Sequence, residues 1–189
     1  LSGTPDGSEV LTVVPVDDGI YDGAGNEAST TQSNNTATLN DKAVPIISTV
    51  ALASNNATIA VTFNEAVYDT TIGSGSLEAS DFSFSIIGGT ATLSSATPSS
   101  ISASGNVYTL GIGLSGTSSG SEVLTVVPVD NGIYDGSGNE ASTTQSNNTA
   151  TLNDQMAPTI SSVTSTKTDG SYKVGEVIPI TVTFSEVVT

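Results

Sequence analysis

The feature that most constrains this chain is an internal repeat with an offset of 113 residues. Residues 1–48 align with residues 114–161 without a gap, and 40 of the 48 positions are identical. An offset of this size is far longer than the repeats of helical solenoids, and it fits one β-sandwich domain of about 100 residues per repeat. The sequence therefore predicts a linear array of similar modules.

The repeat sets the predicted module boundaries. Residues 44–156 form one complete unit, and residues 1–43 form the last part of a preceding unit. Residues 157–189 begin a following unit that diverges, because they carry an insertion relative to the start of the complete one. The chain opens at "LSGTPDGSEV" without a methionine, which suggests an internal piece of a longer protein.

Alternation of apolar with small or polar residues predicts β-strands throughout the complete unit. The runs "ATIAVTF", "FSFSI" and "YTLGIGL" have the period of two that marks strands with one buried face. The predicted strands are 45–53, 57–67, 82–88, 91–103, 106–115, 122–129 and 143–152. We therefore expect an all-β fold, in which each module is a seven-stranded Greek-key sandwich of two antiparallel sheets.

Composition excludes several classes of function. The net charge is −16, and Lys and Arg total 3, so nucleic acids and anionic lipid surfaces would repel the chain. The absence of Cys and His removes disulfides, Ser-His-Asp triads and ordinary zinc sites. No apolar run approaches the roughly 18 residues that suggest a membrane-spanning helix, so direct membrane insertion is not expected. Cations are the natural partners of so many carboxylates.

Strand polarity predicts where the acidic residues gather. In such a sandwich, the entering linker, the end of the second strand and the loop between the last two strands lie at one pole. The candidate metal ligands that this places at module junctions are Asp17, Asp22, Asn26, Asn40, Asp41, Glu65, Asp69, Asp130, Asp135, Asn139, Asn153, Asp154 and Glu186. Those before Asn40 face a module outside this chain, and those after Asn139 belong to the next junction.

Calcium is the cation that this arrangement favours. Two unit charges about 4 Å apart repel by roughly 4 kcal/mol at an effective dielectric near 20. Calcium relieves such repulsion by taking about six to eight oxygen ligands from carboxylates, amides and backbone carbonyls, with less strict geometry than magnesium. The alternative is that "YDGSGNE" and "LND" are ordinary turns, since Asp, Asn and Gly are preferred there for conformational reasons.

Three motifs resemble tandem immunoglobulin-like or cadherin-like repeats of giant bacterial surface adhesins: "DGSGNEAS", "LNDQMAPTISSV" and "YKVGEVIPITVTFSEVV". The resemblance implies secreted stalk or filament modules, displayed on the bacterial cell surface, with calcium at the junctions between neighbouring modules of one chain. It also implies that Asn40–Asp41 and Asn153–Asp154 are ligands of the linker. Thr38 and Thr151 stand where the cadherin linker has its first Asp, which leaves the number of ions open.

Three functions follow from these patterns. The leading prediction is a structural adhesin segment that calcium stiffens, and a spacer suits near-identical copies. The alternative is a module that binds a polysaccharide or a protein partner; the chain has no Trp, which leaves Tyr21, Tyr68, Tyr134 and Tyr172 as aromatic candidates. An enzyme is not expected, because only paired carboxylates are available and an open junction is a poor catalytic cleft. Lateral self-association and a surface glycan stay open as further partners.

Overall fold

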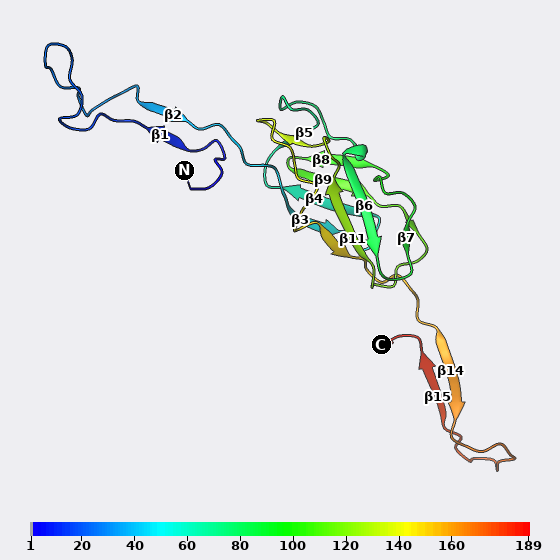
Figure 1. Cartoon of the computed structure of the whole chain (residues 1–189). Helices are drawn as coiled ribbons and strands as arrows, with labels where there is room; N and C mark the ends of the chain where they lie inside the picture. The colour runs from blue at the N-terminus through cyan, green and yellow to red at the C-terminus, as the bar shows by residue number, and fades with distance from the viewer. Residues whose placement is uncertain (1) are drawn as a thin grey trace.

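The computed structural model describes residues 2–189, and its strands are arranged as a central body with a hairpin on either side (Figure 1). The N-terminal hairpin pairs β1 (Val10–Thr12) with β2 (Thr36–Thr38), and the C-terminal hairpin pairs β14 (Ile160–Ser165) with β15 (Ile180–Phe184). The only helical element in these residues is the short 3-10 turn η1 (Ala79–Asp81). Accordingly, no helix in residues 2–189 is long and apolar enough to cross a membrane.

Two antiparallel sheets build the central body. The first has the strand order β3 (Ile47–Leu52), β4 (Thr58–Phe63), β9 (Val107–Gly111), β8 (Ile101–Ser104). The second has the order β13 (Thr149–Thr151), β11 (Val123–Pro128), β6 (Phe82–Ile87). Two short pairs complete it, β5 (Val67–Tyr68) with β12 (Tyr134–Asp135) and β7 (Thr92–Leu93) with β10 (Leu114–Ser115). The all-β prediction is confirmed, and the paired sheets are consistent with a β-sandwich.

The core lies between the two sheets, where the alternating apolar residues of each face meet. On β4 the inward residues are Ile59, Val61 and Phe63, and all three are buried. Three aromatic rings form its centre: Phe63 lies 6.3 Å from Phe82 and 5.9 Å from Tyr108 between ring centroids, the latter edge to face. Such tilted and edge-on pairs add to the stability that burial alone supplies.

The predicted strand 91–103 is wrong as a single element. It divides into β7 and β8, which belong to different sheets, and the segment "SSATPSS" between them includes Pro98, which has no backbone N–H to donate to a ladder. The predicted strand 143–152 shrinks to β13, because Ser142 and Gln145 bond to the backbone of a local turn instead. The predicted strands 57–67 and 106–115 are each interrupted, giving β4 with β5 and β9 with β10.

The terminal hairpins repeat the pairing of their counterparts in the central body. Val10 pairs with Thr38 in the first hairpin, as Val123 pairs with Thr151 at the offset of 113 residues. In β14–β15 the register shifts between Ile160 and Ser162, as it does between Ile47 and Thr49 in β3–β4. Similar sequence has therefore produced the same local structure in both places. Leu1, part of the predicted first unit, lies outside the described residues.

One carboxylate inside the central body has no cationic partner. Glu122 is fully buried just before β11, where its oxygens accept hydrogen bonds from the backbone N–H groups of Thr90, Ala91 and Ser119 at 2.7–3.0 Å. Burial alone raises the pKa of Glu122, but these donors outweigh it and hold the pKa at about 2. Gly89 packs so closely on the carboxylate that a Cβ there would meet it. Glu122 therefore fastens the loop after β6 to the start of β11.

We expect Glu122→Gln to lower the free energy of unfolding at pH 7 by about 1.5–3 kcal/mol, because an amide cannot accept all the bonds that the carboxylate accepts. The folded-state pKa lies below the ordinary 4.5, so the carboxylate stabilises the fold above pH 4.5 and loses this effect as the pH falls toward 2. The difference between variant and wild type should therefore shrink over that range. Urea unfolding, monitored by circular dichroism at several pH values, measures the free energy of unfolding of both proteins. Glu9→Gln is the matched control, since within residues 2–189 the Glu9 carboxylate accepts from the N–H of Asp6 alone; an equal effect there would contradict this role.

Candidate metal centre

Three carboxylates meet where the linker enters the central body. The groups belong to Asp41 in the linker, Glu65 just after β4, and Asp135 in β12, and one oxygen of each lies within 4.8 Å of the others. Asp135 is fully buried, and Asp41 and Glu65 are half-buried. Residues separated by 24 and 70 positions in the sequence thus form one acidic cluster.

Local hydrogen bonds hold Asp135 in place. Its Oδ1 accepts from the backbone N–H groups of Ser137 and Asn139, both at 2.8 Å, which closes a tight turn. The turn also contains Gly138 at φ +83°, where a Cβ would lie 2.5 Å from the carbonyl oxygen of Thr71. Pairing of β12 with β5 then sets this turn beside the end of β4. The sequence "YDGSGNE" therefore forms a turn and at the same time delivers a carboxylate to the cluster.

Asn139 links the turn to the incoming linker. Its Nδ2 donates to Asp135 Oδ2 at 2.8 Å and to the carbonyl oxygen of Asp41 at 3.3 Å. In this orientation the amide positions two members of the cluster through its N–H groups. Asn139 therefore orients the cluster by donating hydrogen bonds, and its side-chain oxygen makes no contact with the three carboxylates in these bonds.

The cluster concentrates negative charge that no lysine neutralises. Partial burial raises the pKa of Glu65, and the charges of Asp135, Asp41 and Asp6 raise it further, against an opposing hydrogen bond from Asn64. Among residues 2–189 the only ion pair joins Lys167 to Glu176 in the C-terminal hairpin. The carboxylates at the junction therefore repel one another, and a proton or a cation would relieve that repulsion.

Asp6 is a member of this site that the sequence analysis missed. It lines one cavity together with Ser8, Asp41, Asn64 and Glu65. Its counterpart in the second copy is Ser119, so it is one of the few positions at which the two copies differ in charge. This charge difference between the copies is the one sequence feature that could have pointed to Asp6. The structure was needed to show that Asp6 lines the same cavity as Asp41.

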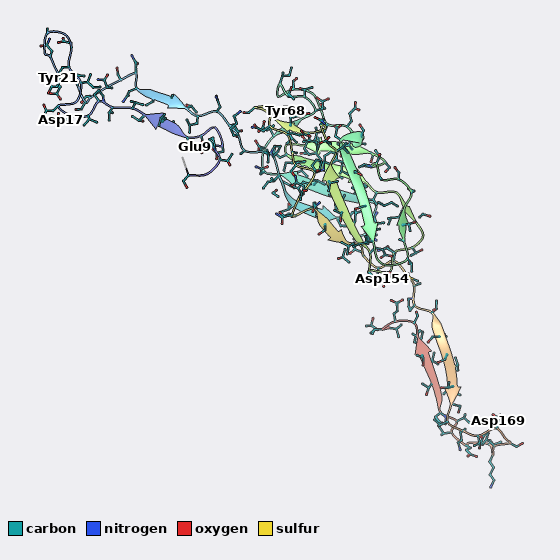
Figure 2. All side chains as sticks on the ribbon, viewed as in Figure 1. Glu9, Asp17, Tyr21, Tyr68, Asp154 and Asp169 are labelled. Carbon is teal, nitrogen blue, oxygen red and sulfur yellow. The ribbon has the colours of Figure 1, made fainter. Side chains whose placement is uncertain are left out.

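The second linker carries a matching cavity. It is lined by Ser119, Asp154, Met156, Ala157, Thr159, Ser185 and Glu186. Asp154 is the counterpart of Asp41, and Glu186 occupies the position of Glu65 in the motif "TF-N/S-E". Figure 2 shows Asp154 at the end of the central body opposite Tyr68, at the start of the C-terminal segment. The two cavities therefore repeat along the chain with the modules.

The other predicted ligands of the central body lie elsewhere. Asp130 lines a separate shallow cavity with Glu140. Asp69 lies near Asp81, whose pKa is raised by burial first and then by the charges of Glu78 and Asp69. One Asp69 oxygen is buried without a hydrogen-bond partner. Neither Asp130 nor Asp69 belongs to the three-carboxylate cluster.

The predicted linker amides are placed differently from the carboxylates beside them. Asn153 donates to Asn56 Oδ1 at 3.0 Å and to the carbonyl oxygen of Ala53 at 3.1 Å, which fastens the linker to the turn between β3 and β4. Its counterpart Asn40 is exposed. The side chain of Asn153 is thus engaged by the module that it leaves, on the side away from the following one.

The predicted ligands of the first hairpin repeat the turn around Asp135. Asp22 Oδ1 accepts from the backbone N–H of Asn26 at 2.9 Å, and the Asn26 side chain donates to its Oδ2 at 2.8 Å. These bonds lower the pKa of Asp22, the side-chain bond most strongly. Asp17 lies with Tyr21 toward the outer end of the N-terminal segment (Figure 2). Tyr21 itself is 52% exposed.

No family model, no curated protein and no solved structure matches this chain. Function therefore has to be inferred from the internal repeat and from the geometry of the junction.

We expect the raised pKa of Glu65 to fall toward its ordinary value in Asp135→Asn, because one of the nearby negative charges is removed. Asp22→Asn makes the same change in the first copy and should leave Glu65 unaffected. Carbon-detected NMR titration of the glutamate carboxyl groups, in a buffer with chelator, measures both. Equal pKa values of Glu65 in the two variants would show that Asp135 does not act on it.

Proposed function

We propose that this chain is a structural segment of a tandem array of immunoglobulin-like modules, of the kind found in bacterial cell-surface adhesins. The division into sheets of four and three strands, with β3-β4-β9-β8 facing β13-β11-β6, has the strand order of constant-type immunoglobulin sandwiches. This order supports a Greek-key module at residues 44–156, and the repeat supports a tandem arrangement. Such modules give a surface protein length and stiffness. Near-identical copies suit this role, because a spacer does not require a different surface on each module.

Calcium at the module junction is the second part of the proposal. The observation that carries it is the convergence of Asp41, Glu65 and Asp135 at the entering linker, with a matching acidic cavity at the following linker. The oxygens are spaced within reach of one hard cation, and Asp6 lines the adjoining cavity. These residues would hold the ion, and the ion would supply only charge neutralisation and rigid coordination.

The mechanical consequence follows from where the ligands originate. Asp41 belongs to the linker, whereas Glu65 and Asp135 belong to the folded module. A cation bound by all three ties the linker to the module and restricts bending at that point. Because binding favours the folded and docked state, it also raises stability by mass action. This role agrees with an extracellular location, where calcium is plentiful, and such a location is part of the proposal.

Glycan binding has weaker support. Of the tyrosines considered as sugar platforms, Tyr134 pairs with Tyr68 across β12 and β5, and the ring of Tyr172 lies 5.2 Å from Lys167 Nζ. Tyr21 is exposed but belongs to the hairpin whose counterpart is largely buried. Partner binding remains the alternative, and a glycan array on the full chain separates it from the structural role.

We expect calcium to raise the melting temperature of the chain by about 10 °C at a hundredfold excess over its dissociation constant, relative to EGTA. Glu65→Gln should remove most of this increase, because it removes a cluster carboxylate without changing side-chain size. Asp130→Asn removes the same charge from the neighbouring loop and should keep the increase. Scanning calorimetry of the three proteins, with magnesium as a second ion, measures the effect.

Two results would overturn the calcium proposal: a melting temperature that is the same in calcium and in EGTA, or equal behaviour of Glu65→Gln and Asp130→Asn. Small-angle scattering tests the mechanical part separately. Calcium should stiffen the first linker, so the chain should sample a narrower range of overall lengths in the scattering data. Glu65→Gln should abolish that change.

A further inference from the structure

The second linker leaves the central body through a small buried polar cluster. Asn56 lies in the turn between β3 and β4, Ser118 lies in the loop before β11, and both are 2% exposed. Their side chains meet Asn153, with which the linker begins after β13. We call these three residues the Asn56 clasp. All three lie within the complete module at residues 44–156.

The side-chain amide of Asn56 uses all of its hydrogen-bonding capacity in the clasp. Its Nδ2 donates to Ser118 Oγ at 2.8 Å and to the carbonyl oxygen of Asn153 at 2.7 Å. Its Oδ1 accepts from the backbone N–H of Asn153 at 2.9 Å and from Asn153 Nδ2 at 3.0 Å. A side-chain amide offers two donor hydrogens and two acceptor lone pairs, so this amide is fully satisfied. Removing it would leave buried polar groups of the linker without partners.

The central body also holds the residue that follows the linker aspartate. The N–H of Gln155 donates to the carbonyl oxygen of Ser118 at 2.9 Å, and Gln155 Nε2 donates to that of Ser54 at 3.1 Å. Asp154 therefore lies between two residues that are both bonded to the module behind them. Residues 153–155 are in this sense an extension of the module that they leave.

The first junction shows the same grip on the linker backbone. The N–H of Lys42 donates to the carbonyl oxygen of Pro5 at 2.8 Å, which repeats the backbone bond of Gln155 at the offset of 113 residues. Gly7 and Gly120 also pack alike, since a Cβ on either would lie 3.2 Å from the Cβ of the linker Asp. The path of the linker beside the segment that it leaves is therefore the same in both copies.

The part of the junction outside these bonds is short. At the first junction the entering module holds the carbonyl oxygen of Asp41 through Asn139 at 3.3 Å, and its own backbone pairing begins at Ile46. Within residues 2–189, the backbone of residues 44–45 and of residues 157–158 makes no hydrogen bond to either module. The second residue of each pair is a proline, whose ring restricts φ to about −65°. Little of the linker is thus left to bend.

We infer that Asn56 is a positioning residue for the linker carboxylate of Asp154. By holding Asn153, it fixes the direction in which the central body presents Asp154 to the next module, and it confines bending to residues 156–158. The clasp acts without any cation. Its bearing on calcium rests on the proposed function, because a carboxylate whose backbone is already ordered loses less conformational entropy when it binds an ion.

The experiment measures amide hydrogen exchange of the full chain by NMR, in a buffer with EGTA so that no divalent cation contributes. We expect the N–H groups of Asn153 and Gln155 to be protected in the wild type. The variant Asn56→Gly removes the side chain and suits the backbone, since Asn56 has φ +58°. Both linker amides should then exchange about tenfold faster, as expected for the loss of one to two net hydrogen bonds. The N–H of Leu152, which donates to the carbonyl oxygen of Glu122, should keep its protection.

The amide of Gln155 separates a positioning role from a purely local bond. Its acceptor is the backbone oxygen of Ser118, which Asn56→Gly leaves in place, so its exchange accelerates only if the linker as a whole is released. Asn55→Gly is the matched control, because it makes the same substitution in the same turn. Asn55 is exposed, and its side chain accepts from the N–H of Ala57, away from the linker. This variant should leave both linker amides protected.

Three results would overturn the inference: linker amides that are unprotected in the wild type, acceleration of Asn153 alone in Asn56→Gly, or equal effects of Asn56→Gly and Asn55→Gly. If Asn56→Gly also releases Leu152, Ser118→Ala replaces it as the test. That variant removes the bond from Ser118 Oγ to the carbonyl oxygen of Asn153 and should accelerate both linker amides by a smaller factor; unchanged exchange there would also contradict the clasp. A melting temperature that calcium does not change would contradict the proposed ion and leave this inference standing.

Discussion

The central body depends on burying the apolar faces of its two sheets against each other. A two-stranded hairpin has one apolar face and is marginally stable alone, so it needs a second layer to exclude water. In the central body β3–β4 and β11–β13 supply those layers to each other, with β6 and β9 at their sides. The terminal hairpins keep the same strand register but lack the facing sheet, so Leu11 and Phe184 remain exposed where Leu124 and Phe63 are buried.

Packing at the pole of the module gathers like charges. The strand that carries Asp135 pairs with β5, Glu65 follows the end of β4, and Asn139 beside Asp135 donates to the carbonyl oxygen of Asp41 in the linker. The fold therefore holds three carboxylates together and raises the pKa of one of them. Glu122 presents the opposite case, because backbone donors surround that carboxylate and lower its pKa. The local supply of N–H donors thus separates Glu122, whose pKa is lowered, from Glu65, whose pKa is raised.

The sequence alone determined the β content, the repeat and the residues that alternate into the core, because these depend on local spacing along a strand. It also indicated that linker, strand end and loop share one pole. Only the tertiary structure decided which acids meet: Asp41, Glu65 and Asp135 converge, Asp6 joins them, and Asp69 and Asp130 lie apart. It likewise turned Asn153 toward Asn56 and divided the predicted strand 91–103 between two sheets. Loop paths and side-chain directions depend on contacts between residues far apart in sequence. The alternation of apolar residues along a strand carries no information about those contacts.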